Sequence, residues 1–138
     1  SLRMSGSLVV TTPNELAMID ALKAINMFRK VEVPIVGLVE NMSYFACPHC
    51  SEHTAIYGKG GVDRAAAEYE TTVIGRIPIE PEVVADSDQG VPVVVARSES
   101  PAARAYLEIA DPVAERFPVE ASGKSGGFRS LFGGKGNS

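Results

Sequence analysis

The 138-residue sequence lacks tryptophan and contains only two cysteines and two histidines. It also has no excess of positive charge, because 13 lysines and arginines stand against 17 aspartates and glutamates, and the net charge of −4 argues against a nucleic-acid partner. No apolar run approaches the ~20 residues that a membrane-spanning helix needs. The N-terminus lacks the basic and apolar order of a secretory signal, so the cytoplasm is the expected compartment.

Glycine is unevenly distributed, since six of the 13 glycines lie in the last 16 residues. A segment of this composition cannot bury enough apolar surface to offset the entropy of the chain. We therefore expect a folded part over residues 5–117 and a flexible Gly/Ser-rich tail over residues 118–138. Phe128, Leu131 and Phe132 have helical spacing in this tail and form a one-turn apolar face, which could contact a membrane surface only by weak, reversible attachment.

Apolar strand-like runs alternate with helical patterns along the folded part. Strands are predicted at residues 7–11, 35–39 and 72–77, and helices at residues 13–30, 62–69, 81–90 and 101–117. This order predicts right-handed crossovers and a parallel sheet, and hence the α/β class.

Local patterns add detail to these elements. Thr12 is expected to cap the first helix, with Pro13 at its first position and Glu15 reaching back to the cap. Residues 92–96 are rich in valine and are expected to be extended, as an edge strand. Pro112 is expected to kink or interrupt the last helix.

The turn after the first strand contains no glycine-rich phosphate loop. Doubly wound nucleotide-binding folds usually have five or more strands and place this loop after the first one. We therefore interpret the chain as the C-terminal part of a longer protein of this kind. The glycine-rich segment at residues 58–64 contains Lys59, but Gly60 stands where a phosphate loop needs a hydroxyl for Mg²⁺, so a turn before a helix is favoured.

Cys47 and Cys50 form the strongest local signal. Two thiolates three positions apart can face one metal ion or cluster, but zinc and iron–sulfur sites usually have four protein ligands. His49 or His53 could add nitrogen ligands, or a second copy of the chain could add its own cysteine pair in a symmetric dimer. The alternatives are a thioredoxin-like dithiol, which the position within a long loop disfavours, and two incidental loop cysteines.

Polar residues follow two of the predicted strands. Asn41 comes just after the second strand, and Pro78 and Glu80 come just after the third. Ligands of open α/β sheets bind at this edge, and the donor and acceptor of an Asn side chain suit the edge of an adenine ring. The alternative is that Asn41 is a turn residue that bonds its own backbone.

Several segments together resemble the Mrp/ApbC family of iron–sulfur cluster carrier ATPases, which belong to the deviant-Walker, MinD/ParA-like class of P-loop NTPases. The segments are Val9–Pro13, Ile25–Lys30, Val39–Phe45, Cys47–Cys50 and Ser100–Ala105. The resemblance covers residues 5–117 and implies the C-terminal part of a doubly wound P-loop NTPase fold, with three core strands and flanking helices.

The resemblance also implies a function. The family binds a [4Fe–4S] cluster at a homodimer interface and transfers it to apo iron–sulfur proteins, so Cys47 and Cys50 would be the cluster ligands. Asn41, Pro78 and Glu80 would lie near the adenine of ATP. The phosphate loop and the Mg²⁺-binding acids of the family precede the region that matches, so ATP and Mg²⁺ are expected only in a full-length parent, and no catalytic residue is predicted here.

Two other functions fit parts of the sequence. A zinc-binding structural module would use the same cysteine pair. A fragment of a MinD-like, membrane-associated positioning ATPase would use the tail, although that function gives no reason for the cysteine pair.

Overall fold

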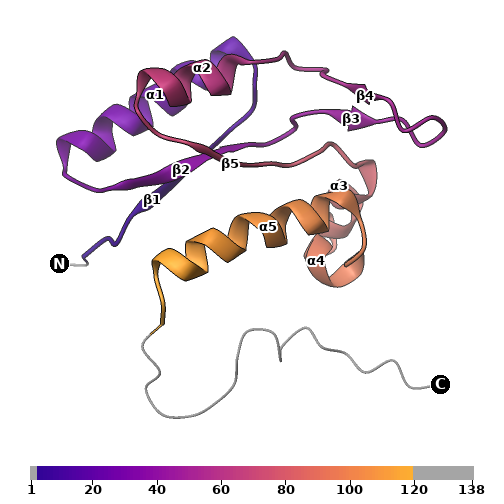
Figure 1. The fold of residues 1–138 in the computed structure, drawn as a ribbon. Helices are drawn as coiled ribbons and strands as arrows, with labels where there is room; N and C mark the ends of the chain where they lie inside the picture. The colour runs from indigo at the N-terminus through magenta and orange to yellow at the C-terminus, as the bar shows by residue number, and fades with distance from the viewer. Residues whose placement is uncertain (1–2, 120–138) are drawn as a thin grey trace.

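The computed structural model describes residues 3–119. At its centre lies a parallel sheet with the strand order β1-β2-β5, built from β1 (Ser7–Thr11), β2 (Ile35–Glu40) and β5 (Val73–Arg76). Figure 1 shows α1 (Glu15–Lys30) and α2 (Gly61–Glu68) on one face of this sheet and α3 (Pro81–Asp88), α4 (Val93–Ala96) and α5 (Pro101–Arg116) on the other. The predicted α/β class, with three core strands in a parallel sheet and flanking helices, is confirmed.

Apolar side chains hold the first helical layer to the sheet. Ile25 of α1 and Val62 of α2 have no exposed surface, and Leu38 of β2 is 1% exposed. Their cluster is completed by Val9, Met18, Ala21, Ala65 and Ala66. Burial on this scale supplies most of the free energy that orders the layer, since each fully buried aliphatic side chain contributes roughly 1.5–3 kcal/mol.

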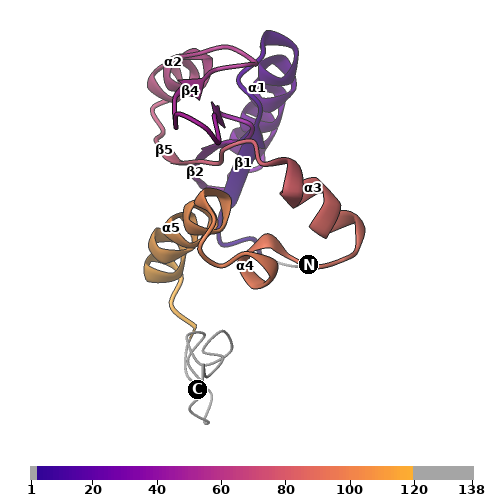
Figure 2. The ribbon, with the colours of Figure 1, turned by 90° about the vertical axis from the view of Figure 1, so that its right-hand side faces the viewer.

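The second layer depends on a glycine in β5. A Cβ atom added at Gly75 would lie 2.1 Å from Cγ1 of Ile109, so α5 packs directly onto the backbone of the strand. Ile109 belongs to a second buried cluster with Val39, Ile77, Val93, Ala102, Ala103 and Ala105. Figure 2, turned by 90°, shows the same arrangement, with α1 and α2 on one side of the sheet and α3, α4 and α5 on the other.

The helix starts were predicted with mixed success. Ser100 caps α5 by accepting a hydrogen bond from the N–H of Ala103 at 3.2 Å, as expected. The prediction that Thr12 caps the first helix is wrong, because α1 begins at Glu15 and the side chain of Asn14 accepts the N–H of Ala17 at 2.8 Å. Asparagine is among the strongest N-cap residues and ranks above threonine.

Two further expectations are corrected by the structure. Residues 93–96 form the short helix α4 rather than an edge strand, because Val93 is buried against the second layer and packing overrides the strand preference of valine. The last helix is not interrupted, since α5 continues through Pro112 to Arg116. Pro112 and Glu108, whose carbonyl loses its partner, are exposed, so water can satisfy that carbonyl.

The loop predicted around the cysteines contains a small antiparallel hairpin, formed by β3 (Phe45–Ala46) and β4 (His53–Thr54). Figure 1 shows this hairpin projecting beyond the end of the main sheet. Within residues 3–119 no helix is long and apolar enough to cross a bilayer. The predicted membrane contact through Phe128, Leu131 and Phe132 lies outside the described residues, as does nearly all of the predicted tail.

Candidate functional site

Cys47 and Cys50 lie in the tight turn at the tip of the β3–β4 hairpin. The N–H of Cys47 donates to the carbonyl of Glu52 at 2.9 Å, and the N–H of Ser51 donates to the carbonyl of Cys47 at 2.8 Å. Ser51 has a φ of 60°, which lets the chain reverse over a short distance. The two cysteines are not joined by a disulfide; Cys47 is half-buried and Cys50 is exposed.

The turn creates an environment that favours a thiolate. Hydrogen bonds from the backbone N–H groups of His49 and Cys50, and from the Cys50 side chain, lower the pKa of the Cys47 thiol, and these effects outweigh its partial burial. A thiolate rather than a thiol is the form that binds metals. The backbone of the turn therefore favours the thiolate form of Cys47.

The two histidines of this region behave differently. The His53 ring stacks on the Tyr44 ring with centroids 4.1 Å apart and an interplanar angle of 19°. His49 is exposed at the hairpin tip. Among residues 3–119, no three or more His, Cys, Asp or Glu side chains are grouped so that they could hold a metal ion.

The residues predicted to bind a nucleotide lie at the carboxyl edge of the sheet. The N–H of Asn41 donates to the carbonyl of Thr11 at 2.7 Å, and its side-chain oxygen accepts the N–H of Met42 at 3.0 Å. Asn41 thus bonds the neighbouring backbone, as the turn interpretation predicted, and it remains half-buried at the end of β2. Pro78 is buried beyond the end of β5.

Glu80 has a structural contact that the sequence patterns did not indicate. Its Oε1 accepts the N–H of Ala102 at 2.8 Å and so satisfies an unpaired donor in the first turn of α5. Its role near a nucleotide stays a prediction.

Charged groups that were not predicted either lie at the end of β2, where the chain leaves the sheet toward the cysteines. Glu40, at the end of β2, is only 5% exposed, and its Oε1 accepts a hydrogen bond from the Ser43 hydroxyl. Nε of Arg76 lies 3.7 Å from the same oxygen, and another nitrogen of Arg76 bonds Asp63. In the sequence, these contacts were indicated by Glu40 itself, an acidic residue at the end of an otherwise apolar strand.

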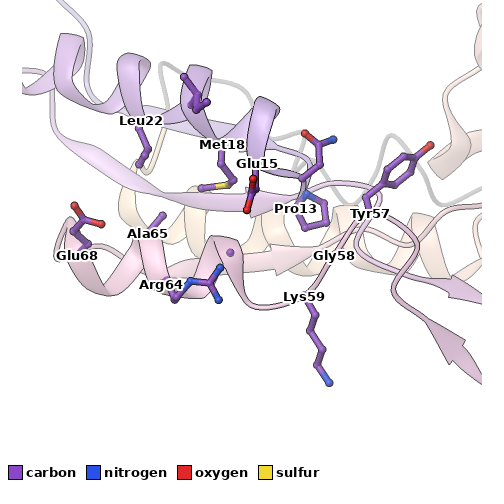
Figure 3. Close-up of a pocket in the computed structure, with 13 residues that line it drawn as sticks. Pro13, Glu15, Met18, Leu22, Tyr57, Gly58, Lys59, Arg64, Ala65 and Glu68 are labelled. Atoms are coloured by element: carbon purple, nitrogen blue, oxygen red, sulfur yellow. The ribbon is translucent and has the colours of Figure 1, made fainter.

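The glycine-rich segment at residues 58–61 forms a turn before a helix, as predicted. Gly60 has a φ of 81° and stands at the N-cap of α2. The segment forms one end of a groove of about 470 Å³ between α1 and α2, whose lining includes Met18, Leu22 and Arg64. Figure 3 shows the Lys59 side chain pointing away from this groove. The groove does not include the cysteines.

Comparison with known sequences gives a consistent result. Residues 1–114 match a family described as ParA, NUBPL iron-transfer P-loop NTPase. A protein of Arabidopsis thaliana named "Iron-sulfur protein required for NADH dehydrogenase, mitochondrial" is 49% identical over 113 residues, which are 82% of this chain and 36% of that protein. An Escherichia coli K12 protein named "Iron-sulfur cluster carrier protein" is 45% identical over 111 residues, 80% of this chain and 30% of that one. The chain spans about a third of the length of these curated relatives.

Solved structures agree on the fold. A nucleotide-binding protein from Archaeoglobus fulgidus, in complex with ADP, is 38% identical with a TM-score of 0.54, covering 62% of this chain and 35% of that one. The cell division ATPase MinD of Pyrococcus furiosus has a TM-score of 0.63 at 21% identity, covering 80% of this chain and 43% of that one. The second likeness concerns the fold alone.

Proposed function

Because the chain belongs to the ParA/NUBPL family of iron-transfer P-loop NTPases, we propose that it is the cluster-holding part of an iron–sulfur cluster carrier. In this proposal Cys47 and Cys50 bind a [4Fe–4S] cluster as cargo. The same pair in a second copy of the chain completes the ligand set. The cluster then passes to an apo iron–sulfur protein.

The observation that carries the proposal is the arrangement of the two thiols. They share one tight turn, Cys50 is exposed, and backbone N–H groups lower the pKa of Cys47. Donors aimed at a thiolate sulfur both hold it and tune its strength as a ligand. This chemistry fits a site that must hold a cluster and also release it.

A second copy is proposed because two thiolates are half of the usual four-ligand set. A two-fold axis through the cluster would bring equivalent hairpin tips together, since symmetric dimers use the same surface of both chains. Apolar side chains near the hairpin support this interface, because Ile56 is 55% exposed and Tyr57 is 45% exposed. The chain would bury them on pairing.

Transfer is proposed to proceed by ligand exchange. A cysteine of the recipient forms a bond to one iron, the bond from that iron to Cys50 breaks, and the proton of the recipient thiol passes to the released Cys50 sulfur. No electron is gained or lost in this exchange. Cys50 would be replaced before Cys47, because Cys50 is the more exposed of the two.

The nucleotide part of the proposal concerns a longer protein. In that protein Asn41, Pro78 and Glu80 would lie near the adenine of ATP, with the phosphate loop and the Mg²⁺ ligands supplied by residues that precede this region. Support comes from the position of Asn41 and Pro78 at the carboxyl edge of a parallel sheet. The cytoplasm is the proposed compartment.

Anaerobic reconstitution with iron and sulfide tests the cluster site. We expect about four irons and four sulfides per two chains, a visible absorbance band and a dimeric mass, by analogy with clusters held by four cysteines. Cys47→Ser combined with Cys50→Ser should abolish the band and the dimer, whereas Ser51→Ala in the same turn should keep both. A double cysteine variant that retains its cluster would contradict the proposal.

Metal analysis after purification in air separates the cluster carrier from the zinc module. Zinc bound stoichiometrically by the unmodified chain, with no cluster formed under anaerobic reconstitution, would support the zinc-binding alternative. A cluster that forms anaerobically and is lost in air supports the carrier.

A further inference from the structure

The segment between β2 and α2, residues 41–60, leaves the main sheet and returns to it, and we call it the cysteine excursion. Every residue from position 48 to position 59 is exposed, so little packing holds its outer half. Its position relative to the sheet must therefore be set near its two ends. Both ends are tied to charged side chains at the carboxyl edge of the sheet.

The first end is held by Glu40. The Ser43 hydroxyl donates to Glu40 Oε1, while the Ser43 N–H donates to the carbonyl of Ile77 at 3.0 Å. Between Glu40 and Ser43, Met42 has a φ of 52°, a left-handed backbone conformation that residues other than glycine and asparagine rarely adopt. The bond between Glu40 and Ser43 closes this turn and sets the direction in which the chain leaves β2.

The second end is held by Asp63. This residue lies in the first turn of α2, three positions after the excursion ends, and its carboxylate bonds a guanidinium nitrogen of Arg76 in β5. The side chain of Asp63 is 56% exposed, so the contact is a surface ion pair. Such a pair contributes little to global stability.

Arg76 joins the two ends. It is the register partner of Glu40 in the parallel sheet, and its Nε lies 3.7 Å from Glu40 Oε1 while its terminal nitrogen reaches Asp63. One guanidinium thus lies between Glu40, the residue just before the excursion, and α2, the helix that follows it. Arginine suits this position because its rigid fork presents several donors in one plane.

The buried carboxylate of Glu40 is not fully satisfied by these contacts. Its Oε1 accepts a hydrogen bond from Ser43 and lies near Arg76, whereas its Oε2 is buried and has no hydrogen-bond partner among residues 3–119. A buried carboxylate with an unpaired oxygen carries a cost in stability. Replacing a buried ion pair by apolar residues is often neutral or stabilising, which favours a role for Glu40 other than stabilising the core.

We propose that Glu40, Arg76 and Asp63 form a clasp that positions the hairpin carrying Cys47 and Cys50 for metal binding. This inference rests on the proposed function, because it assigns the clasp to the same cysteine site. The three side chains would not touch the metal. They would fix the two ends of the cysteine excursion, so that the thiols meet the metal in one orientation rather than in many.

Co²⁺ titration of the complete 138-residue chain tests the clasp, with the thiolate-to-Co²⁺ absorbance as the readout. Asp63→Asn should weaken the apparent Co²⁺ affinity about tenfold, the lower end of the loss usual when groups that support metal ligands are removed. Asp63→Glu keeps the carboxylate and should restore most of the affinity. Glu40→Gln keeps an acceptor for Ser43 but loses the charge that faces Arg76, and it should weaken Co²⁺ binding by a similar factor.

The matched control is Asp86→Asn. Asp86 pairs with Arg97 at 2.7 Å in the opposite helical layer, so its loss removes another Asp–Arg ion pair, one whose carboxylate is 16% exposed against 56% for Asp63. The Co²⁺ affinity of the Asp86→Asn variant should stay unchanged. Because Asp63 is on the surface, its variant remains informative if the buried Glu40→Gln variant fails to fold.

The outcomes distinguish the clasp from the site that it serves. If Asp63→Asn binds Co²⁺ as tightly as the unmodified chain does, or loses no more than Asp86→Asn, the clasp is contradicted. If Cys47→Ser combined with Cys50→Ser gives the same titration as the unmodified chain, the cysteine site itself is contradicted. Loss of affinity in Asp63→Asn at an unchanged urea midpoint, with recovery in Asp63→Glu, supports the clasp.

Discussion

The sheet with its two helical layers and the cysteine excursion are held in different ways. In the first region Ile25 has no exposed surface and Leu38 is 1% exposed, whereas in the second every residue from position 48 to position 59 is exposed. The excursion is attached by a few directional bonds, such as the one from the Ile79 N–H to the Tyr44 carbonyl at 2.7 Å. Apolar burial therefore fixes the first region and hydrogen bonds fix the second.

This difference separates stability from function. Truncating one buried apolar side chain lowers the free energy of unfolding by several kcal/mol. An individual hydrogen bond or surface ion pair contributes about 1 kcal/mol or less to it. We expect substitutions in the layers to lower the free energy of unfolding. Substitutions in the excursion should instead change thiol chemistry and metal affinity at nearly constant stability.

The largest effect is expected from truncation in the first layer. Ile25→Ala should lower the free energy of unfolding by about 2–5 kcal/mol, because it removes buried methyl groups and leaves a cavity. Ile56→Ala in the excursion is the matched truncation and should change it by less than about 0.5 kcal/mol. Urea unfolding measures the free energy of unfolding of both variants. Equal losses at the two positions would contradict the difference proposed between the two regions.

A smaller effect is expected where α5 packs onto β5. Gly75→Ala should destabilise the fold by about 1–3 kcal/mol, because the new methyl group overlaps Ile109. Ile109→Ala creates room for that methyl group, so the double variant should lose less stability than the sum of the two single losses. If the loss in the double variant equalled the sum of the two single losses, a part of the structure other than Ile109 would be accommodating the new methyl group.

A cap substitution should have a still smaller effect. Asn14→Ala removes the acceptor of the Ala17 N–H and should cost about 1 kcal/mol of unfolding free energy. Thr12→Ala tests the cap position expected from sequence, and it should cost clearly less. A larger loss at Thr12 than at Asn14 would place the start of α1 two residues earlier.

Much of the layered region could be predicted from sequence, because its signals are local and periodic. The apolar strands and the cap of α5 at Ser100 follow from residue order alone. The predicted strand at residues 92–96 failed because Val93 is buried against another helix, a tertiary contact that no local pattern contains. The cap of α1 was misplaced because both Thr12 and Asn14 are good cap residues.

The excursion was less predictable, and for a physical reason. The spacing of Cys47 and Cys50 identified the pair, but the short strands beside them contain two residues each, too few for a periodic signal. The contact of Glu40 with Arg76 joins two strands, β2 and β5. The capping contact of Glu80 with Ala102 spans 22 positions in the chain. These contacts depend on the folded sheet, so the sequence could not show them.

The smallest effect on stability is expected from substitutions that test whether the turn of the excursion lowers the pKa of the Cys47 thiol. In a Cys50→Ala variant the backbone N–H groups of His49 and residue 50 still point to the Cys47 sulfur, so its pKa should stay below the ordinary value for cysteine. A lowered pKa means that the thiolate forms at lower pH, and the midpoint of the rate of alkylation by iodoacetamide should shift to lower pH accordingly. The same variant unfolded in urea loses these donors and should titrate at the ordinary value. His49→Pro removes one N–H donor and should raise the midpoint, whereas His49→Ala keeps the donor and should not. Equal midpoints in the folded and unfolded chain would mean that the turn does not prepare the sulfur, and the hairpin would then supply position without tuning the ligand.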